Sequence, residues 1–221
     1  MSVRQEIKDY IDNIKKMADD NSLECDIVVE ESYQPDKTIV DLACQHNADI
    51  LIMGRHGRNK LMKLLVGSMT SKVIGHGFPK VLVVPKDFSI GGDKVLLAVD
   101  GSEFSEMAAD EAISMGVSCT TLKKVYALSV ATNESKLDKA RELVDAVCDK
   151  GKKKAPNVEF EPLALTGRPS EVIAATAKEK GVDIILAGGH GKGLGKLLMG
   201  HVTEKVIGRA HCAVLVVEKK K

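Results

Sequence analysis

Residues 182–192 read VDIILAGGHGK and residues 48–58 read ADILIMGRHGR, so the chain contains closely similar stretches in two places. The similarity continues from residues 67–84, GSMTSKVIGHGFPKVLVV, to residues 200–217, GHVTEKVIGRAHCAVLVV. Each copy predicts a buried strand, a glycine-rich turn and the start of a helix, in that order. An α/β fold commonly binds phosphate at such a turn, because the first amides of the helix point toward the anion. The repeat therefore bears on function as well as on fold.

The bulk composition limits the classes of function. The chain has 221 residues, and its 32 lysines and arginines balance 31 aspartates and glutamates. A near-neutral chain with no Trp is not built for general binding of nucleic acid or of anionic membranes. No apolar run approaches the roughly 20 residues of a membrane span, and the N-terminus lacks the apolar core of a secretion signal. Five scattered cysteines predict free thiols, so we expect a cytoplasmic protein.

The second copy alternates strands with helices. Apolar runs predict strands at residues 94–99, 122–130, 158–165, 183–187 and 213–217, and helical spacing predicts helices at 103–116, 134–154, 169–180 and 203–208. Pro169 suits the first turn of its helix, where a missing amide proton costs nothing. This alternation predicts a parallel sheet with helices on both faces.

The first copy is shorter. A predicted helix at residues 3–18 matches residues 134–154, Cys25–Glu30 match the third strand, and nothing matches residues 94–130. The chain therefore divides into an incomplete domain, a turn-rich linker and a complete domain, at residues 1–85, 86–93 and 94–218.

The segment without a counterpart would supply strand 1, helix 1 and strand 2 of the first copy. Without strand 1, Cys25–Glu30 cannot pair normally with the strand at residues 50–53. Three explanations stay open: a shortened gene, a second chain that lends the strands, or irregular packing of the half-domain. An edge strand left bare would favour association.

The pattern that most strongly indicates a binding site is Gly54-x-x-Gly57, followed after nine residues by Gly67-Ser68. Glycine directly after a buried strand lets a ligand approach the backbone, and a helix start offers free amide protons to an anion. Ser68 and Thr70 could add hydroxyl groups. The alternatives are that the glycines only permit tight turns and that Ser68 only caps its helix.

These motifs resemble those of the universal stress protein family, whose pattern G-x2-G-x9-G-[ST] lies between the fourth strand and the last helix. The stretch VLLAVDGSEFS at residues 95–105 is similar to the family's first strand and its acidic residue. The resemblance implies an α/β, Rossmann-like, five-stranded parallel sheet of order 3-2-1-4-5, here as a truncated copy plus a full copy. Many members bind ATP, with or without Mg²⁺, whereas others lack the motif and do not.

The resemblance also implies how copies associate. Members pair through the last strand, which joins the two halves in tandem members. The matching strands here are Val81–Val84 and Val214–Val217, so we expect self-association through them.

The resemblance assigns the site residues position by position. Asp100 would face the ribose or adenine side of the nucleotide, and the backbone near Val99 would flank the base. In the second copy, the triphosphate would meet Gly188, His190 and Gly191, and the phosphate-binding helix would start with Gly200, His201, Val202 and Thr203. The equivalents in the first copy are Met53, Gly54, His56, Gly57, Gly67, Ser68, Met69 and Thr70.

The second copy departs from the family pattern at two points. Only eight residues separate Gly191 from Gly200, which would shift the loop by up to about 3.5 Å. His201 stands where the family has Ser or Thr, and we expect this larger side chain to displace its surroundings. The first copy keeps the glycine motif but has no acidic residue like Asp100, which could itself be a turn or N-cap residue. The phosphate end is thus better preserved in the first copy, and the nucleoside end in the second.

The favoured function is an ATP-binding or adenine-nucleotide-binding regulatory protein of the stress response. The alternative is an interaction protein with vestigial pockets that acts through dimerisation or through docking of an unidentified protein. Catalysis is not indicated, because the chain has no G-x4-G-K-[ST] string and no evident nucleophile–base pair. His190, His201 and His211 fit no common metal-ligand spacing, so no metal site is expected.

Overall fold

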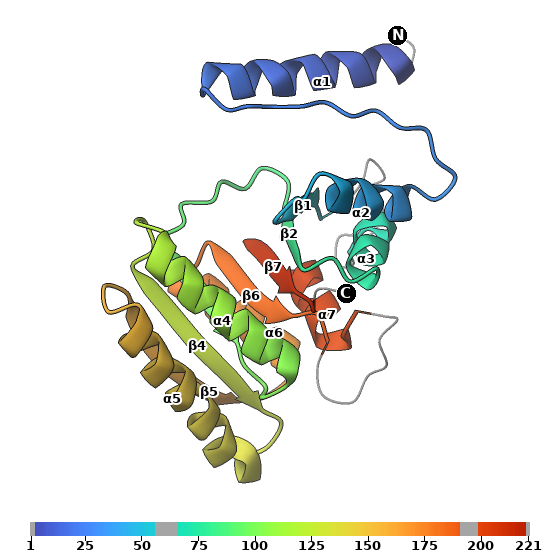
Figure 1. The fold of residues 1–221 in the computed structure, drawn as a ribbon. Helices are drawn as coiled ribbons and strands as arrows, with labels where there is room; N and C mark the ends of the chain where they lie inside the picture. Colours follow the sequence, from blue (N-terminus) through green and yellow to red (C-terminus); the bar gives the residue numbers. More distant parts are fainter. Residues whose placement is uncertain (1–2, 56–65, 191–198, 220–221) are drawn as a thin grey trace. The chain divides into compact units, whose positions relative to one another are not determined.

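The computed structural model describes residues 3–55, 66–190 and 199–219. The chain forms two compact units, Met1–Pro35 and Asp36–Lys221 (Figure 1).

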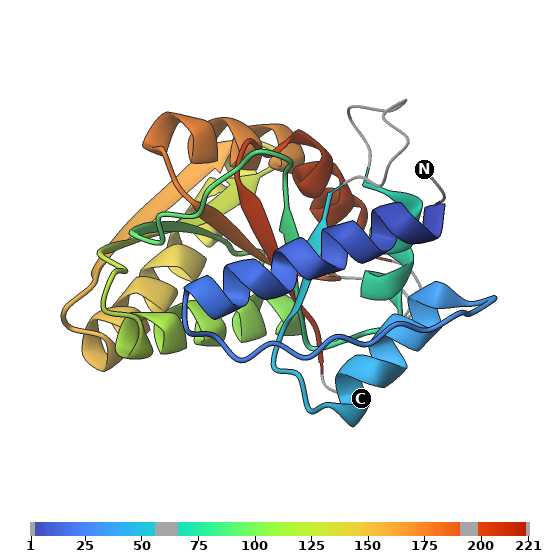
Figure 2. The same ribbon diagram turned by 90° about the horizontal axis from the view of Figure 1, so that it is seen from above.

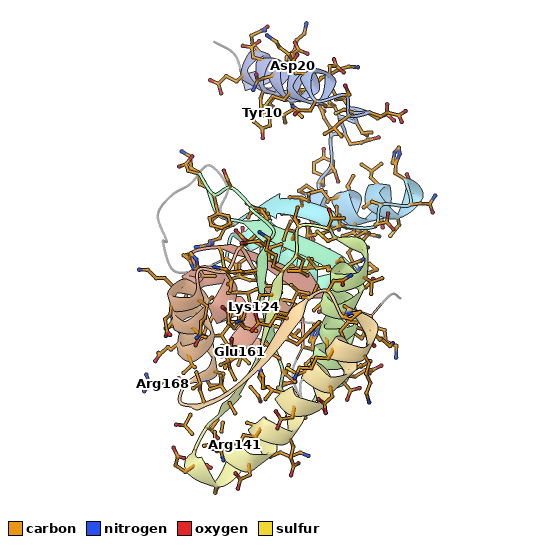
Figure 3. All side chains as sticks on the ribbon, turned by 90° about the vertical axis from the view of Figure 1, so that its left-hand side faces the viewer. Tyr10, Asp20, Lys124, Arg141, Glu161 and Arg168 are labelled. Atoms are coloured by element: carbon orange, nitrogen blue, oxygen red, sulfur yellow. The ribbon has the colours of Figure 1, made fainter. Side chains whose placement is uncertain are left out.

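The first unit consists of helix α1 (Val3–Asp20) and an extended segment that follows it. Apolar side chains at heptad spacing are exposed on α1, at Ile7, Tyr10, Ile14 and Met17. Tyr10 is labelled in Figure 3. The expectation of a strand at Cys25–Glu30 is wrong, because these residues form no ladder. The matching strand of the second copy is held by backbone hydrogen bonds to a neighbouring strand, and the described part of the first copy supplies no such neighbour.

The second unit contains one seven-stranded sheet of order β1-β2-β7-β6-β3-β4-β5. Its strands are β1 (Leu51–Gly54), β2 (Lys80–Val84), β3 (Lys94–Ala98), β4 (Lys124–Ala131), β5 (Glu159–Thr166), β6 (Ile184–Gly188) and β7 (Ala213–Val217). The five strands of the second copy are parallel and follow the predicted order 3-2-1-4-5. At the β4–β5 margin, Lys124 Nζ lies 2.6 Å from Glu161 Oε2 (Figure 3).

The two copies meet at their last strands. β2 and β7 are antiparallel, with Val81 opposite Val216 and Val83 opposite Val214. This pairing confirms that the last strands join the halves. It also corrects the expectation that they mediate association between chains, because β2 lies between β1 and β7 and β7 lies between β2 and β6.

Helices cover the sheet from both sides (Figure 2). Side chains of α2 (Pro35–Gln45), α3 (Ser68–Gly75), α6 (Pro169–Lys180) and α7 (His201–Arg209) belong to one apolar cluster. Side chains of α4 (Glu103–Ser118) and α5 (Leu137–Lys154) belong to the other. Along β6, Ile185 joins the first cluster while Ile184 and Leu186 join the second, as the alternation of a strand requires.

Local signals set most helix ends. Pro169 opens α6, and Gly181 closes it in the left-handed conformation, with φ of 60°. Several boundaries differ from the predictions: α4 continues past Gly116 to Ser118, α7 begins at His201 rather than Thr203, and a short 3₁₀ turn, η1 (Glu134–Lys136), precedes α5. Within the described ranges, no helix combines the length and apolarity needed to cross a membrane. Cys212 is buried, and this burial raises the pKa of its thiol to about 12.

Asp183 fastens the linker to the sheet, and its removal should destabilise the protein. Its carboxylate accepts hydrogen bonds from the amides of Gly91 at 3.1 Å, Asp93 at 3.2 Å and Lys94 at 3.3 Å. We expect Asp183→Ala to lower the free energy of unfolding by about 1–3 kcal/mol, measured by urea denaturation. Asp138→Ala, which removes an exposed carboxylate paired with Arg141, should cost at most about 0.5 kcal/mol. Equal losses of unfolding free energy in Asp183→Ala and Asp138→Ala would contradict the role of Asp183 in holding the linker.

The same carboxylate predicts a pH dependence. Burial raises the pKa of Asp183, but the backbone hydrogen bonds outweigh burial and lower the pKa below its ordinary value. Its contribution to stability is therefore complete above the unfolded-chain pKa of about 3.9 and is lost as the pH falls through the lower folded pKa. The wild-type protein and Asp183→Ala should accordingly converge in stability under acid.

Candidate functional site

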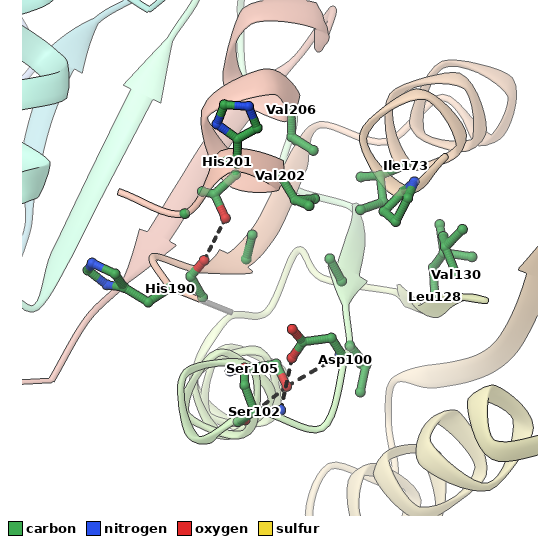
Figure 4. Close-up of a pocket in the computed structure, with 17 residues that line it drawn as sticks. Asp100, Ser102, Ser105, Leu128, Val130, Ile173, His190, His201, Val202 and Val206 are labelled. Atoms are coloured by element: carbon green, nitrogen blue, oxygen red, sulfur yellow. Dashed lines mark hydrogen bonds between the residues drawn. The ribbon is translucent and has the colours of Figure 1, made fainter. Parts of the chain in front are cut away.

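A cavity of about 300 Å³ opens at the carboxyl ends of β3 and β6 (Figure 4). The chain runs outward from β3 through β4 to β5, and then from β6 to β7 in the opposite direction. A crevice at such a reversal of strand order is the usual ligand site of an open parallel sheet. The structure places the predicted residues Val99, Asp100, Gly188, His190, Gly200, His201, Val202 and Thr203 around this one cavity.

The turn from β3 into α4 presents Asp100 at the cavity. Gly101 has φ of 73°, a conformation that favours glycine, and this lets the chain reverse directly after the strand. Asp100 Oδ1 accepts a hydrogen bond from the amide of Ser102 at 2.9 Å. The N-cap of α4 is Ser102, not Asp100, since Ser102 Oγ accepts from the amide of Ser105 at 3.2 Å. Asp100 is exposed, so its second carboxylate oxygen is available to a ligand.

The opposite wall is the first turn of α7. Gly200 is its N-cap, and its amide donates to the carbonyl of Gly189 at 2.7 Å. The hydroxyl of Thr203 donates to the carbonyl of Gly188 at 2.7 Å and therefore fixes the helix to β6 rather than offering its proton to a ligand. The amides that follow, at His201, Val202 and Thr203, belong to the first turn, which an α-helix does not bond internally. They supply donors and a partial positive charge for an anion.

His190 follows β6 and is buried, at 6% exposure. Its Nδ1 lies 2.9 Å from Glu218 Oε1, and its ring packs beside Phe104 with centroids 5.2 Å apart. Figure 4 shows the ring directed away from Asp100. The contacts of the ring are therefore with the protein, whereas the sequence predicted a histidine beside phosphate.

The first copy reproduces the same local geometry. Its helix start at Gly67 has φ of −57° and ψ of 140°, against −59° and 136° at Gly200. The amide of Gly67 donates to the carbonyl of Arg55 at 2.8 Å, and the hydroxyl of Thr70 donates to that of Gly54 at 2.9 Å. The agreement corrects the expectation that His201 displaces its surroundings, because its side chain is exposed.

The other predicted site residues of the first copy lie in different surroundings. The expectation that Ser68 caps its helix is wrong, since the N-cap is Gly67 and has no side-chain hydrogen bond. Ser68 is exposed and Met69 is half-buried on the first turn of α3, and Met53 lies on β1. His56, Gly57 and Gly191 lie outside the described residues.

Sequence reasoning missed the apolar walls of the cavity. These side chains come from the end of β4, the start of α6 and the inner face of α7, at Leu128, Val130, Pro169, Ile173 and Val206. The signal was present in the strand order, because a β4 placed beside β3 brings the end of β4 to the same edge of the sheet. An apolar slot with a carboxylate on one side and helix amides on the other suits a ligand with a flat apolar part, hydroxyl groups and an anionic group.

Comparisons with known proteins agree with this geometry. Residues 2–85 and 92–218 match the model of the universal stress protein family. A universal stress protein of Methanocaldococcus jannaschii is 32% identical over 157 residues, which cover 64% of this chain and 96% of that protein. A universal stress protein of Mycobacterium bovis is 26% identical over 201 residues, which cover 82% of this chain but only 65% of that protein.

The fold is also similar to that of a solved structure. A universal stress protein from Archaeoglobus fulgidus superposes with a TM-score of 0.76 at 20% identity, over 99% of this chain and 78% of that chain. At this identity the likeness speaks for the fold alone, and it spans both copies of the repeat. The family model, in contrast, matches nearly the whole sequence in two segments. The chain therefore belongs to the universal stress protein family.

Proposed function

We propose that this chain binds an adenine nucleotide in the cavity between β3, β6 and α7, and that it acts as a nucleotide-dependent regulatory protein of the stress response. The observation that carries the proposal is the meeting of three chemically different walls in one cavity. Val99, Leu128 and Ile173 offer apolar contact to a base. Asp100 offers a carboxylate oxygen to ribose hydroxyls, and the first turn of α7 offers amides to phosphate.

The residues that are present fit such a ligand. Gly200 leaves the start of α7 without a side chain where phosphate would approach. Asp100 is held by its hydrogen bond with the amide of Ser102, so its position does not depend on the ligand. Bound nucleotide would thus connect the β3–α4 turn with the start of α7. This connection would stabilise the loops that surround the site, and a partner could read that change.

A thermal shift measurement tests the proposal. We expect ATP with Mg²⁺ to raise the melting temperature, because a ligand at 100 times its dissociation constant stabilises the folded state by about 2.7 kcal/mol. Asp100→Asn keeps an acceptor for the amide of Ser102 but removes the charge that faces the ribose, so the shift should shrink while the unliganded melting temperature stays close to that of the wild type. Phosphate without nucleoside should give a much smaller shift. No shift with millimolar ATP would refute nucleotide binding.

A further inference from the structure

Among the described residues of the unit Asp36–Lys221, no strand covers the outer edge of β1, and one face of this strand is exposed. β1 is the terminal strand of the sheet, and within residues 3–55, 66–190 and 199–219 no strand pairs with its outer edge. Its residues alternate between two environments: Leu51 and Met53 pack against the apolar cluster of α2, α3, α6 and α7, whereas Ile52 on the other face is 66% exposed. Ile50, directly before the strand, is 37% exposed.

The second copy shows what covers the equivalent surface. β1 pairs with β2 in the register in which β6 pairs with β7, since Leu51 opposite Val81 corresponds to Ile185 opposite Val214. The counterparts of Ile50 and Ile52 are Ile184 and Leu186, which are 7% and 0% exposed. β3 pairs in parallel with the outer edge of β6, and α4 covers the face of Ile184 and Leu186 through Ala108, Ala112 and Ile113.

A glycine marks the same surface in both copies. Gly188, at the end of β6, leaves room for α4, because a Cβ there would lie 2.7 Å from the carbonyl carbon of Phe104. Gly54 occupies the equivalent place on β1 and is exposed. The first copy therefore has the apolar residues and the glycine on which a strand and a helix would pack.

We propose that the bare edge and face of β1 form a docking site for a strand–helix segment, and that this segment has the chemistry of Lys94–Ser118. The strand would be short, apolar on both faces and parallel to β1, and the helix would present small residues to Ile50 and Ile52. A second copy of β1, paired edge to edge, is the weaker candidate, because it would satisfy the backbone of the edge but leave the Ile52 face uncovered. The edge also lacks Lys, Pro and a bulge, the usual devices that prevent strand addition.

The test adds a synthetic peptide with the sequence of residues 94–118 to the full chain. We expect saturable binding at one peptide per chain and slower hydrogen exchange at the amides of Leu51–Met53. Ile52→Lys places a charge on the exposed face and should weaken binding at least tenfold without unfolding the protein. Val117→Lys is the matched control, since Val117 is also 66% exposed but lies on α4, and it should leave binding unchanged.

Three results would overturn the proposal. The first is an absence of binding at millimolar peptide while circular dichroism shows a folded chain. The second is binding that Ile52→Lys and Val117→Lys weaken equally. The third is a dimer of the chain alone, detected by sedimentation, that Ile52→Lys dissociates and the peptide does not, because the occupant would then be a second copy. Nucleotide plays no part in this surface, so the outcome is independent of the function proposed above.

Discussion

Gly188→Ala should destabilise the protein by about 1–3 kcal/mol, the range of overpacking substitutions in a dense core. The added Cβ would meet backbone and Cβ atoms of Phe104 at 2.7 Å. The backbone of α4 cannot move aside as the end of a long side chain could, so the helix must shift away from β6. Urea denaturation measures the cost as a lower midpoint with an unchanged slope.

The repeat provides the control for this substitution. Gly54 is the counterpart of Gly188 in the first copy, it is exposed, and its φ is not positive. Gly54→Ala should therefore change the free energy of unfolding by at most about 0.5 kcal/mol, as at most surface sites. Equal losses at the two positions would mean that the close approach of α4 to β6 is not the cause.

Gly200→Val should weaken ATP binding at least about tenfold, or about 1.4 kcal/mol, while the protein stays folded. The backbone at Gly200, with φ of −59° and ψ of 136°, lies in a region that valine adopts readily. The side chain would occupy the place where phosphate approaches the first amides of α7. Fluorescence competition with a labelled nucleotide measures the affinity, and circular dichroism verifies the fold.

Gly67→Val is the corresponding change in the first copy, where the helix start has the same backbone angles. We expect it to leave ATP affinity unchanged. The described residues that line the cavity, including Asp100 and the apolar side chains, all come from the second copy. If Gly67→Val abolished binding and Gly200→Val did not, the nucleotide site would belong to the first copy.

The fold of the second copy was predictable because each of its elements carries a local signal. Pro169 and Gly181 delimit α6, and the apolar runs at β3, β6 and β7 lie between turn residues. Local signals were insufficient for Cys25–Glu30, which have the composition of a strand but form no ladder. A β-strand needs backbone hydrogen bonds to a neighbouring strand, and the periodicity of its own sequence does not show whether that neighbour is present.

The structure places Asp100, Gly188 and Gly200 around one cavity, as the sequence indicated, and binding of a nucleotide there stays a prediction. The roles of individual side chains were less accessible. Thr70 was expected to offer its hydroxyl to phosphate, yet it donates its proton to the carbonyl of Gly54, just as Thr203 donates to the carbonyl of Gly188. His190 was expected beside phosphate, yet its ring lies against Phe104 and Glu218. A hydroxyl or an imidazole near a turn has several partners within reach, and tertiary packing decides among them.

Isothermal titration calorimetry of the purified wild-type chain with ATP and Mg²⁺ tests nucleotide binding at the β3–β6–α7 cavity most directly. We expect one molecule of ATP per chain, with the affinity unchanged in Gly67→Val and reduced at least about tenfold in Gly200→Val. A titration that gives no heat at several temperatures and at millimolar ATP, from protein shown to be folded, would contradict the assignment of this cavity to a nucleotide.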